Sequence, residues 1–229
     1  MLILNIETTT NVGSVSLSKD GFTWVLIEEK DSGDHAGQLT IFIQQILNIA
    51  DKNLSEVDAI AVSEGPGSYT GLRIGVSAAK GICYTLEKPL IAVNTLKTMA
   101  YAVGLYHTIG VNDIIVSLQD ARRMDAYAAV YDKDLNEIKA SFFLTLEPDS
   151  FLDLIPEGAK LWICGNSAEK WKTLLSDPRV IFSNVKAPSS RFLEKLSAEA
   201  FENKAFEDVA YFEPFYLKPP NVTKPKALL

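Results

Sequence analysis

Apolar positions at the start of the chain follow the pattern of β-strands. Residues 2–7 form a continuous apolar run that ends in a Glu-Thr-Thr-Thr turn, and residues 12–18 alternate apolar with small polar side chains, the period of a half-buried strand. Asp20-Gly21 is a hairpin signal, so residues 22–28 are expected to return as a third strand. The chain therefore opens with three consecutive strands, of which the first two or three pair antiparallel.

After a polar loop at 31–34, the apolar spacing alternates between that of helices and that of buried strands. Helices are predicted over 37–50, 72–87 and 96–106, and strands over 57–62 and 89–93. The first half of the chain thus has the order βββαβαβα.

The second half repeats this topology without repeating the sequence. Strands are predicted over 114–118, 126–131, 137–144, 160–164 and 180–182, and helices over 149–154, 167–175 and 190–206. Three meander strands are again followed by alternating helices and strands, which is an internal repeat of an α/β unit. The pattern therefore predicts an α/β protein in two similar halves.

Composition narrows the class of protein. The 229 residues are 47% apolar and 22% charged, as in soluble globular domains. No apolar run approaches the roughly 18 residues of a membrane span, and the first residues lack the basic region of a secretory signal. The net charge of −7 argues against a stand-alone nucleic-acid binder, although a local basic patch can still touch RNA. Cys83 and Cys164 lie in apolar segments and are expected to be buried free thiols, which fits a reducing compartment.

The richest local motif joins the strand at 57–62 to the next helix and reads Ser63-Glu64-Gly65-Pro66-Gly67-Ser68-Tyr69-Thr70-Gly71. Its glycines permit close backbone approach and open a helix N-terminus, which favours anions. It is not a P-loop, because Gly71-Leu72-Arg73 stands where that motif has Gly-Lys-Ser/Thr, and its spacing is not the dinucleotide fingerprint. The motif alone therefore does not establish phosphate binding.

The two helices nearest this motif carry more apolar surface than one contact needs. In the helix at 37–50 most apolar side chains cover an arc of about 160°, which indicates two neighbours. The next helix carries a stripe of small residues and a second apolar strip beside it. The stripe consists of Gly71, Gly75, Ala78 and Ala79, extended by Ile82 and Leu86, and the second strip consists of Leu72, Val76 and Cys83. Either one strip faces the sheet and the other a partner, or both belong to the core.

Three acidic residues raise a different hypothesis. Glu7, Glu64 and Asp120 each follow a predicted strand, and if those strands are neighbours the carboxylates could hold a divalent metal. Otherwise they are three solvated loop acids. The two histidines, His35 and His107, are too far apart for a His-x-x-x-His or His-Glu-x-x-His pair, which excludes helical zinc-enzyme motifs.

The segment Ser63-Glu64-Gly65-Pro66-Gly67-Ser68-Tyr69-Thr70-Gly71-Leu72-Arg73-Ile74-Gly75 also resembles the signature of the TsaB (YeaZ) proteins. Supporting segments follow in order at 3–9, 120–127, 165–167 and 214–218. The resemblance spans nearly the whole chain. It implies the actin/Hsp70/sugar-kinase-like (ASKHA) fold, an α/β fold of two ribonuclease-H-like lobes that each contain a mixed sheet.

The family fold gives expected boundaries along the chain. The N-terminal, partner-binding lobe is expected over 1–106 and the C-terminal lobe over 107–189. A long helix over 190–212 is expected to pack back toward the N-terminal lobe, and 213–229 is a Pro/Lys-rich tail.

The resemblance implies a role in making N6-threonylcarbamoyladenosine in tRNA. It implies a non-catalytic, cytoplasmic scaffold and activator that pairs with a TsaD-type catalytic paralogue and a TsaE-type ATPase and meets tRNA through the complex. In the family, pairing uses the two helices that match 37–50 and 71–87 here. The implied interface consists of Leu39, Phe42, Ile43, Ile46, Gly71, Leu72, Gly75, Val76, Ala78, Ala79 and Ile82. The same surface could form a homodimer without the partner, and Gly75→Leu is expected to abolish pairing while the monomer stays folded.

The resemblance further implies a degenerate nucleotide pocket made by Glu7, Thr8, Thr9, Gly65 and Gly67, with weak or absent ATP binding and no metal or cofactor. Glu7 stands where active members of the superfamily carry an aspartate. Two enzyme alternatives stay open: a kinase-like ATPase that uses this pocket, and a metal-dependent enzyme that uses Glu7, Glu64 and Asp120. The tail over 218–226 either contacts the tRNA backbone or is solvated.

Overall fold

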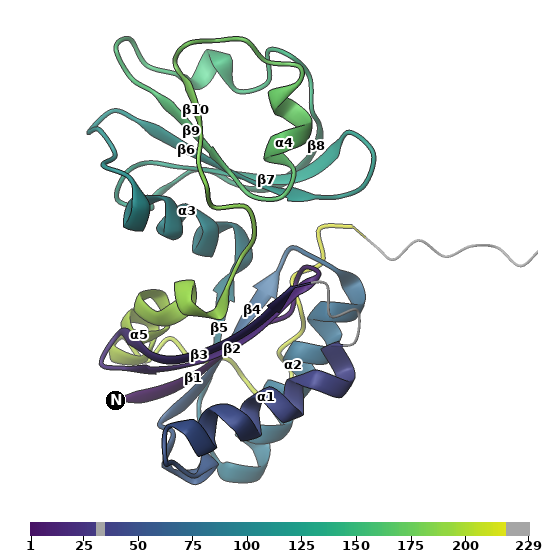
Figure 1. The fold of residues 1–229 in the computed structure, drawn as a ribbon, viewed down its shortest axis with the longest axis vertical. Coiled ribbons are helices and arrows are strands. Elements are labelled where there is room, and N and C mark those ends of the chain that lie inside the picture. Colours follow the sequence, from purple (N-terminus) through teal and green to yellow (C-terminus); the bar gives the residue numbers. More distant parts are fainter. Residues whose placement is uncertain (31–34, 219–229) are drawn as a thin grey trace, which may run out of the picture.

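Two five-stranded mixed sheets organise the chain, and a computed structural model describes residues 1–30 and 35–218 of it. The first lobe contains β1 (Leu2–Glu7), β2 (Val12–Lys19), β3 (Phe22–Lys30), α1 (His35–Ile49), β4 (Ala59–Gly65), α2 (Tyr69–Leu86) and β5 (Leu90–Asn94). After α3 (Thr95–Tyr106), the second lobe contains β6 (Ile114–Asp120), β7 (Asp125–Tyr131), β8 (Glu137–Thr145), β9 (Leu161–Cys164), α4 (Ala168–Lys172) and β10 (Val180–Phe182), and α5 (Glu194–Glu202) follows. The two lobes are stacked along the longest axis of the molecule (Figure 1).

Both sheets have the same strand order. The first sheet runs β3-β2-β1-β4-β5 and the second β8-β7-β6-β9-β10. In each, the three meander strands pair antiparallel, the fourth strand pairs parallel to the first, and the fifth pairs parallel to the fourth. The predicted internal repeat of two ribonuclease-H-like units, each with a mixed sheet, is confirmed.

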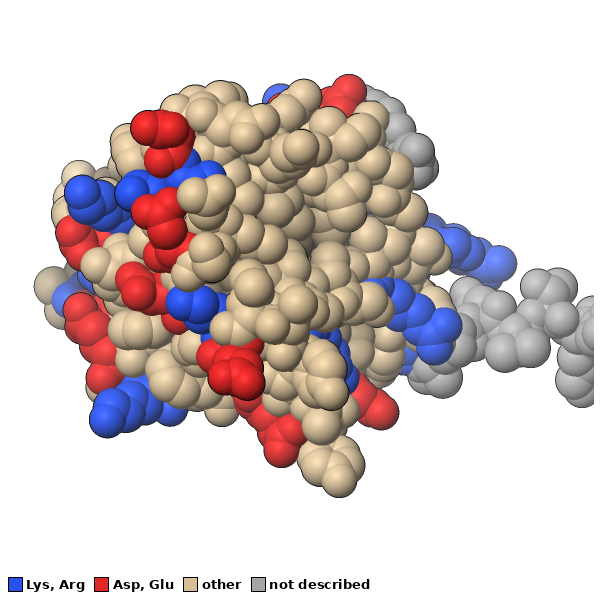
Figure 2. Space-filling model, turned by 90° about the horizontal axis from the view of Figure 1, so that it is seen from below, with Lys and Arg blue, Asp and Glu red and all other residues tan. Residues whose placement is uncertain are grey.

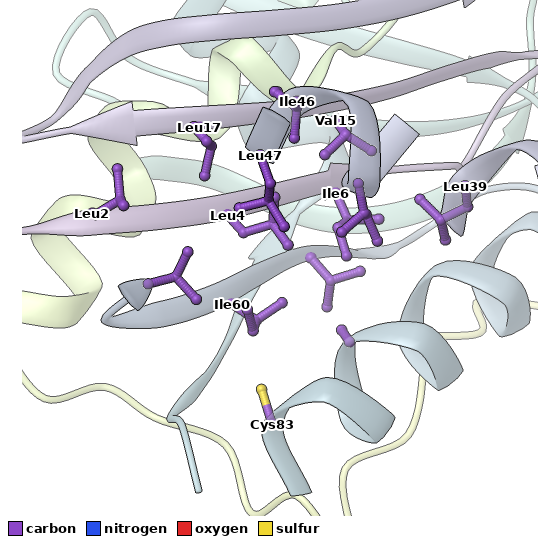
Figure 3. Packing of buried hydrophobic residues seen from close by; sticks show 14 of the residues in the cluster. Leu2, Leu4, Ile6, Val15, Leu17, Leu39, Ile46, Leu47, Ile60 and Cys83 are labelled. Carbon is purple, nitrogen blue, oxygen red and sulfur yellow. The ribbon is translucent and has the colours of Figure 1, made fainter. Parts of the chain in front are cut away.

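The strand β1 of the first sheet is buried on both faces, and its sequence divides between them. Leu2, Leu4 and Ile6 point into a core that α1 and α2 cover (Figure 3). Ile3 points to the opposite face and packs with Leu196 of α5. Because successive strand residues point to opposite sides, a strand covered on both faces must be apolar at nearly every position. This explains the continuous apolar run.

Helix α3 lies between the two sheets (Figure 1). Its buried residues Leu96, Met99 and Val103 form one cluster with Ile115 and Tyr131 of the second sheet. Helix α3 therefore supplies much of the packing between the lobes.

The chain beyond α5 returns along the first lobe as a C-terminal strap (residues 205–218). Glu207 pairs with Leu90 at the free edge of β5, and the Lys80 ammonium group donates a 2.7 Å hydrogen bond to the Phe212 carbonyl. The strap then crosses to the second lobe, where Lys218 forms a 3.5 Å ion pair with Asp125. Lys224 and Lys226 of the predicted tail lie outside the described residues.

Three predicted helices are shorter than expected. The helix predicted over 190–206, and over 190–212 from the family fold, is a 3-10 turn (Ser190–Leu193) followed by α5, and Lys204 at φ 53° prevents its continuation. The helix predicted over 149–154 is a single 3-10 turn at Leu152–Leu154, and that over 167–175 is reduced to α4. Periodicity marks the apolar face of such segments but not the backbone turns that end them.

The two cysteines are buried free thiols, as predicted. Burial raises the pKa of both thiols to about 12, so neither is a reactive thiolate near neutral pH. Within the described ranges, no helix is both long and apolar enough to cross a membrane.

Candidate functional site

The end of β1 holds a buried carboxyl group that organises the first turn of the predicted nucleotide pocket. Glu7 is fully buried, and its Oε1 accepts hydrogen bonds from the Thr9 backbone N–H at 2.5 Å and from the Thr9 hydroxyl at 2.6 Å. Its Oε2 accepts a hydrogen bond from the Ser63 hydroxyl on β4. The backbone N–H group that a phosphate would need at this turn is already bonded to the protein's own side chain. Glu7 thus closes this turn onto the protein's own side chains.

The next residue of the turn packs against α2. The Thr8 hydroxyl donates a 2.7 Å hydrogen bond to the Gly71 carbonyl. A Cβ atom on Gly71 would overlap the Thr8 carbonyl, and a Cβ on Gly75 would overlap the Thr8 hydroxyl. The two glycines therefore allow the β1–β2 turn to approach the helix backbone, and neither belongs to a partner surface.

This packing corrects the predicted interface on α2. Gly71, Leu72, Gly75, Val76 and Ala79 are all buried within the first lobe. The small-residue stripe thus faces the protein's own β1–β2 turn and sheet rather than a partner. The structure leaves no space for a leucine at Gly75, so we expect Gly75→Leu to destabilise the monomer itself.

Helix α1 requires a similar correction. Leu39, Ile43 and Ile46 are buried against the first sheet, so they cannot form a docking surface. Of the predicted interface, only Phe42 on α1 and Ala78 and Ile82 on α2 remain half-buried and reach the surface. Most of the apolar arc of α1 faces the first sheet and α1 also contacts α2, so the helix has the two neighbours that its arc predicts.

The surface that the two helices leave open has no acidic side chain. Neither α1 nor α2 contains an Asp or Glu residue, although the whole chain carries a net charge of −7. Figure 2, seen from below, shows a broad area without charged side chains, which gather to one side and at the rim. We call the outward side of the two helices the α1–α2 face, which includes Ile41 (51% exposed), the half-buried Phe42, Ile74, Ala78 and Ile82, and the exposed Gly81.

The three acids of the metal hypothesis do not form one site. Glu7 is bonded to Thr9 and Ser63, whereas Asp120 accepts a hydrogen bond from the Arg122 backbone N–H at 2.7 Å and pairs with Lys170. Within residues 1–30 and 35–218, no group of three His, Cys, Asp or Glu side chains has the arrangement of a metal site. The metal-dependent alternative is wrong for these residues.

Glu64 lies at the end of β4 in an environment that disfavours its charge. Burial raises the pKa of its carboxyl group to about 6, and the nearby Glu207 and Glu137 add to the effect while a hydrogen bond from Asn94 opposes it. Below the unfolded pKa of 4.5 the group is protonated in both states. As the pH rises from there to about 6, the unfolded chain loses the proton first, so the folded state loses relative stability.

Glu64→Gln is therefore expected to stabilise the protein at neutral pH and to have little effect in acid. The raised pKa corresponds to at most about 2 kcal/mol, which partial exposure reduces to about 1 kcal/mol. Urea unfolding of the variant and the parent at about pH 7.5 and about pH 4 measures the difference. An equal effect at both pH values would show that the carboxyl charge is not the cause.

A cavity of about 1040 Å³ opens between the lobes above the β1–β2 turn. Its walls include Thr9 and Gly67 of the predicted pocket, Gln119 of β6, and Tyr216 of the strap. Gly65 does not reach it. With φ at 120°, Gly65 lies directly beneath the strap, and a Cβ there would be 2.6 Å from the Phe215 carbonyl oxygen. Glu7 and Thr8 lie beneath this cavity rather than in its lining.

Sequence reasoning missed several residues that shape this cavity. Gln119 bridges the lobes, because its amide Nε2 donates a 3.1 Å hydrogen bond to the Thr9 carbonyl. Tyr216 stacks on Tyr69 with ring centroids 4.9 Å apart. Lys218 reaches the Phe143 ring at 3.3 Å from its centroid. The supporting segment at 214–218 contains Tyr216 and Lys218, and Lys218 also begins the predicted tail, whereas Gln119 had no signal in the sequence.

Comparisons with known proteins agree with this architecture. The family model described as TsaD, tRNA N6-adenosine threonylcarbamoyltransferase, matches residues 28–228. The Escherichia coli (strain K12) protein named tRNA threonylcarbamoyladenosine biosynthesis protein TsaB is 29% identical over 223 residues, which cover 95% of each chain.

Solved structures extend the likeness to the fold. The structure of YeaZ from Pseudomonas aeruginosa matches with a TM-score of 0.82 at 23% identity and covers 94% of this chain and 99% of that one. An activator of 2-hydroxyisocaproyl-CoA dehydratase from Clostridium difficile, solved with bound ADPNP, matches with a TM-score of 0.50 at 9% identity, over 90% of this chain and 97% of that one. The expected actin/Hsp70/sugar-kinase-like fold is confirmed.

Proposed function

Because the chain belongs to the TsaD family, and within it to the TsaB (YeaZ) proteins of tRNA threonylcarbamoyladenosine biosynthesis, we propose that it is the non-catalytic scaffold and activator subunit of the threonylcarbamoyltransferase complex. In this role it pairs with a TsaD-type catalytic paralogue, and a TsaE-type ATPase joins the pair. It meets tRNA through the assembled complex.

The α1–α2 face is the observation that carries this proposal. It exposes apolar side chains from two adjacent helices, and neither helix has an acidic residue to oppose a partner. Exposed apolar patches of this kind mark protein–protein contacts. A partner that presents a matching helix pair would cover the face and bury Ile41, Ile74 and the neighbouring half-buried residues.

The chemistry of the predicted pocket supports a non-catalytic role. Glu7 already accepts hydrogen bonds from the backbone N–H and hydroxyl of Thr9 in the β1–β2 turn and from the Ser63 hydroxyl on β4. The sequence has no His-x-x-x-His pair, and His107 packs on the Trp162 ring with its Nε2 3.3 Å from the Ser183 hydroxyl. The subunit would therefore hold the catalytic partner in a competent shape without contacting the reacting atoms.

Size-exclusion chromatography with light scattering tests the proposal on this chain mixed with the TsaD-type protein of the same organism. We expect a one-to-one complex that replaces the free species. The double variant Ile41→Glu/Gly81→Glu is expected to weaken pairing at least about 10-fold, because two carboxylates would have to be desolvated at the interface. Gly81 has no atom within 4 Å of its would-be Cβ and Ile41 is exposed, so the variant is expected to fold.

Val111→Glu is the matched control, because Val111 is 77% exposed but lies outside α1 and α2. This control is expected to pair normally. Normal pairing by Ile41→Glu/Gly81→Glu, or equal weakening by the control, would contradict the assignment of the face. A homodimer of the chain alone that the double variant dissociates would show that the face also binds a second copy.

A further inference from the structure

A second cavity lies beside the first at the junction of the lobes. It measures about 790 Å³, and its walls come from the end of β3, the end of α3 and the segment 184–192 that leads into α5. Asn11 and Asn166 belong to the walls of both cavities. The two cavities therefore adjoin, and together we call them the interlobe groove.

The lining of the interlobe groove has the opposite charge balance to the rest of the chain. Five basic side chains and two acidic ones line it: Arg122, Lys218, Lys30, Lys186 and Arg191, against Asp120 and Glu28. The negative charge of Asp120 is balanced by its ion pair with Lys170. Among the described residues, no ion pair involves Lys30, Arg122 or Arg191. A chain of net charge −7 thus places three unpaired cations at one groove, where they attract a polyanion.

Each cavity also has a buried polar atom that lacks a partner. Gln119 is 2% exposed and lines the first cavity, and its Oε1 has no hydrogen-bond partner within the described ranges. Ser189 is 4% exposed and lines the second, and its hydroxyl is likewise without one there. Buried polar atoms in native proteins are nearly always hydrogen-bonded. These two atoms are therefore candidate contacts for a polar ligand.

Aromatic rings complete the lining. Tyr127 and Tyr216 border the first cavity, and Tyr106 and Phe192 border the second with ring centroids 6.2 Å apart. Rings of this kind stack on unpaired nucleobases. The Asn166 Oδ1 accepts a 2.7 Å hydrogen bond from the Asp120 backbone N–H, and the Nδ2 of the same side chain can donate to a base edge. The lining thus offers contacts to both the phosphates and the bases of one strand.

We propose that the interlobe groove binds a segment of single-stranded RNA. The unpaired cations belong to two adjoining cavities, which matches a ligand with phosphates at several positions better than a single compact phosphate. The identification of the strand as substrate tRNA rests on the proposed function. The groove would then hold part of the tRNA while the partner of the α1–α2 face performs the transfer.

Fluorescence anisotropy of a labelled single-stranded RNA of about 12 nucleotides tests the proposal on the 229-residue chain. Arg122→Glu/Arg191→Glu is expected to weaken binding at least about 10-fold and to lower the slope of log K against log salt by about 1.4, the value for two lost phosphate contacts on a single strand. Lys160→Glu, an exposed substitution outside both cavities, is expected to match the parent. If circular dichroism shows that Arg122→Glu/Arg191→Glu is unfolded, the double variant Arg122→Glu/Lys30→Glu is used in its place.

Three results would overturn the proposal. They are no RNA binding by the parent at about 50 mM salt, equal binding by the parent and the groove variants, and competition by AMP as strong as that by the RNA. The last result would identify a mononucleotide site instead. Pairing with the TsaD-type protein, measured on the same variants, separates the two proposals. Groove variants that lose RNA binding but still pair with the TsaD-type protein would support RNA binding by the groove. If the parent itself failed to pair, the proposed function would fail, but the measured RNA binding would still stand.

Discussion

Gly75→Leu is expected to destabilise the folded chain by at least about 3 kcal/mol. A Cβ at this position already overlaps the Thr8 hydroxyl, and the remaining leucine atoms would enter the space between α2 and Val62. Overpacking a dense core typically costs about 1–3 kcal/mol. Displacement of Thr8 would also break its hydrogen bond to the Gly71 carbonyl inside the protein. Urea unfolding followed by circular dichroism measures the loss.

Gly81→Ala is the matched control on the same helix. No atom lies within 4 Å of its would-be Cβ, so the added methyl group meets open space. Alanine is the better helix former, and the variant is expected to gain about 0.5–1 kcal/mol. If Gly75→Leu unfolded at the urea concentration of the parent, the close approach of the β1–β2 turn to α2 would be wrong, and a role for Gly75 in pairing would be open again.

The repeat of topology could be predicted because the sheet patterns are strong. The apolar run of β1 and the alternation of β2 each follow from which faces of a strand are buried. Apolar periodicity does not predict where a helix ends. The end of α5, for example, depends on the left-handed backbone of Lys204.

The candidate interface shows where sequence spacing stops being informative. A stripe of small residues is equally suited to a partner's backbone and to the protein's own backbone. Only the structure shows that Thr8 occupies the position opposite Gly71 and Gly75. The identity of the neighbour depends on contacts between residues more than sixty positions apart, which a helical wheel cannot supply.

The interlobe groove was invisible to motif reasoning for a related reason. Its cations come from distant segments, such as Lys30, Arg122 and Arg191, and of these three only Arg122, in the segment 120–127, has a basic neighbour in the sequence. The net charge of −7 described the average surface and concealed this local excess of basic side chains. Glu7, in contrast, was found because it ends a strand at the position of a known pocket.

Glu7→Ala is expected to lose about 3–5 kcal/mol of stability. The substitution removes the acceptor for the Thr9 N–H, the Thr9 hydroxyl and the Ser63 hydroxyl, all of which are buried. Each buried donor left without a partner costs about 1–3 kcal/mol, and the lost side chain also leaves a cavity. Urea unfolding of the parent and the variant gives the difference directly.

Glu7→Gln separates the hydrogen-bond role from a catalytic one. Glutamine keeps the volume and one acceptor oxygen for Thr9, and the Ser63 hydroxyl can rotate to accept from the new amide. We therefore expect a loss of only about 1–2 kcal/mol. Calorimetry with ATP and Mg²⁺ is expected to show no binding by the parent, because Glu7 already bonds the donors of the turn. Micromolar ATP binding by the parent that Glu7→Gln abolishes would instead favour the kinase-like alternative. In that case the buried carboxyl group of Glu7 would belong to a working nucleotide site. It would not serve only to bond Thr9 and Ser63 within the protein.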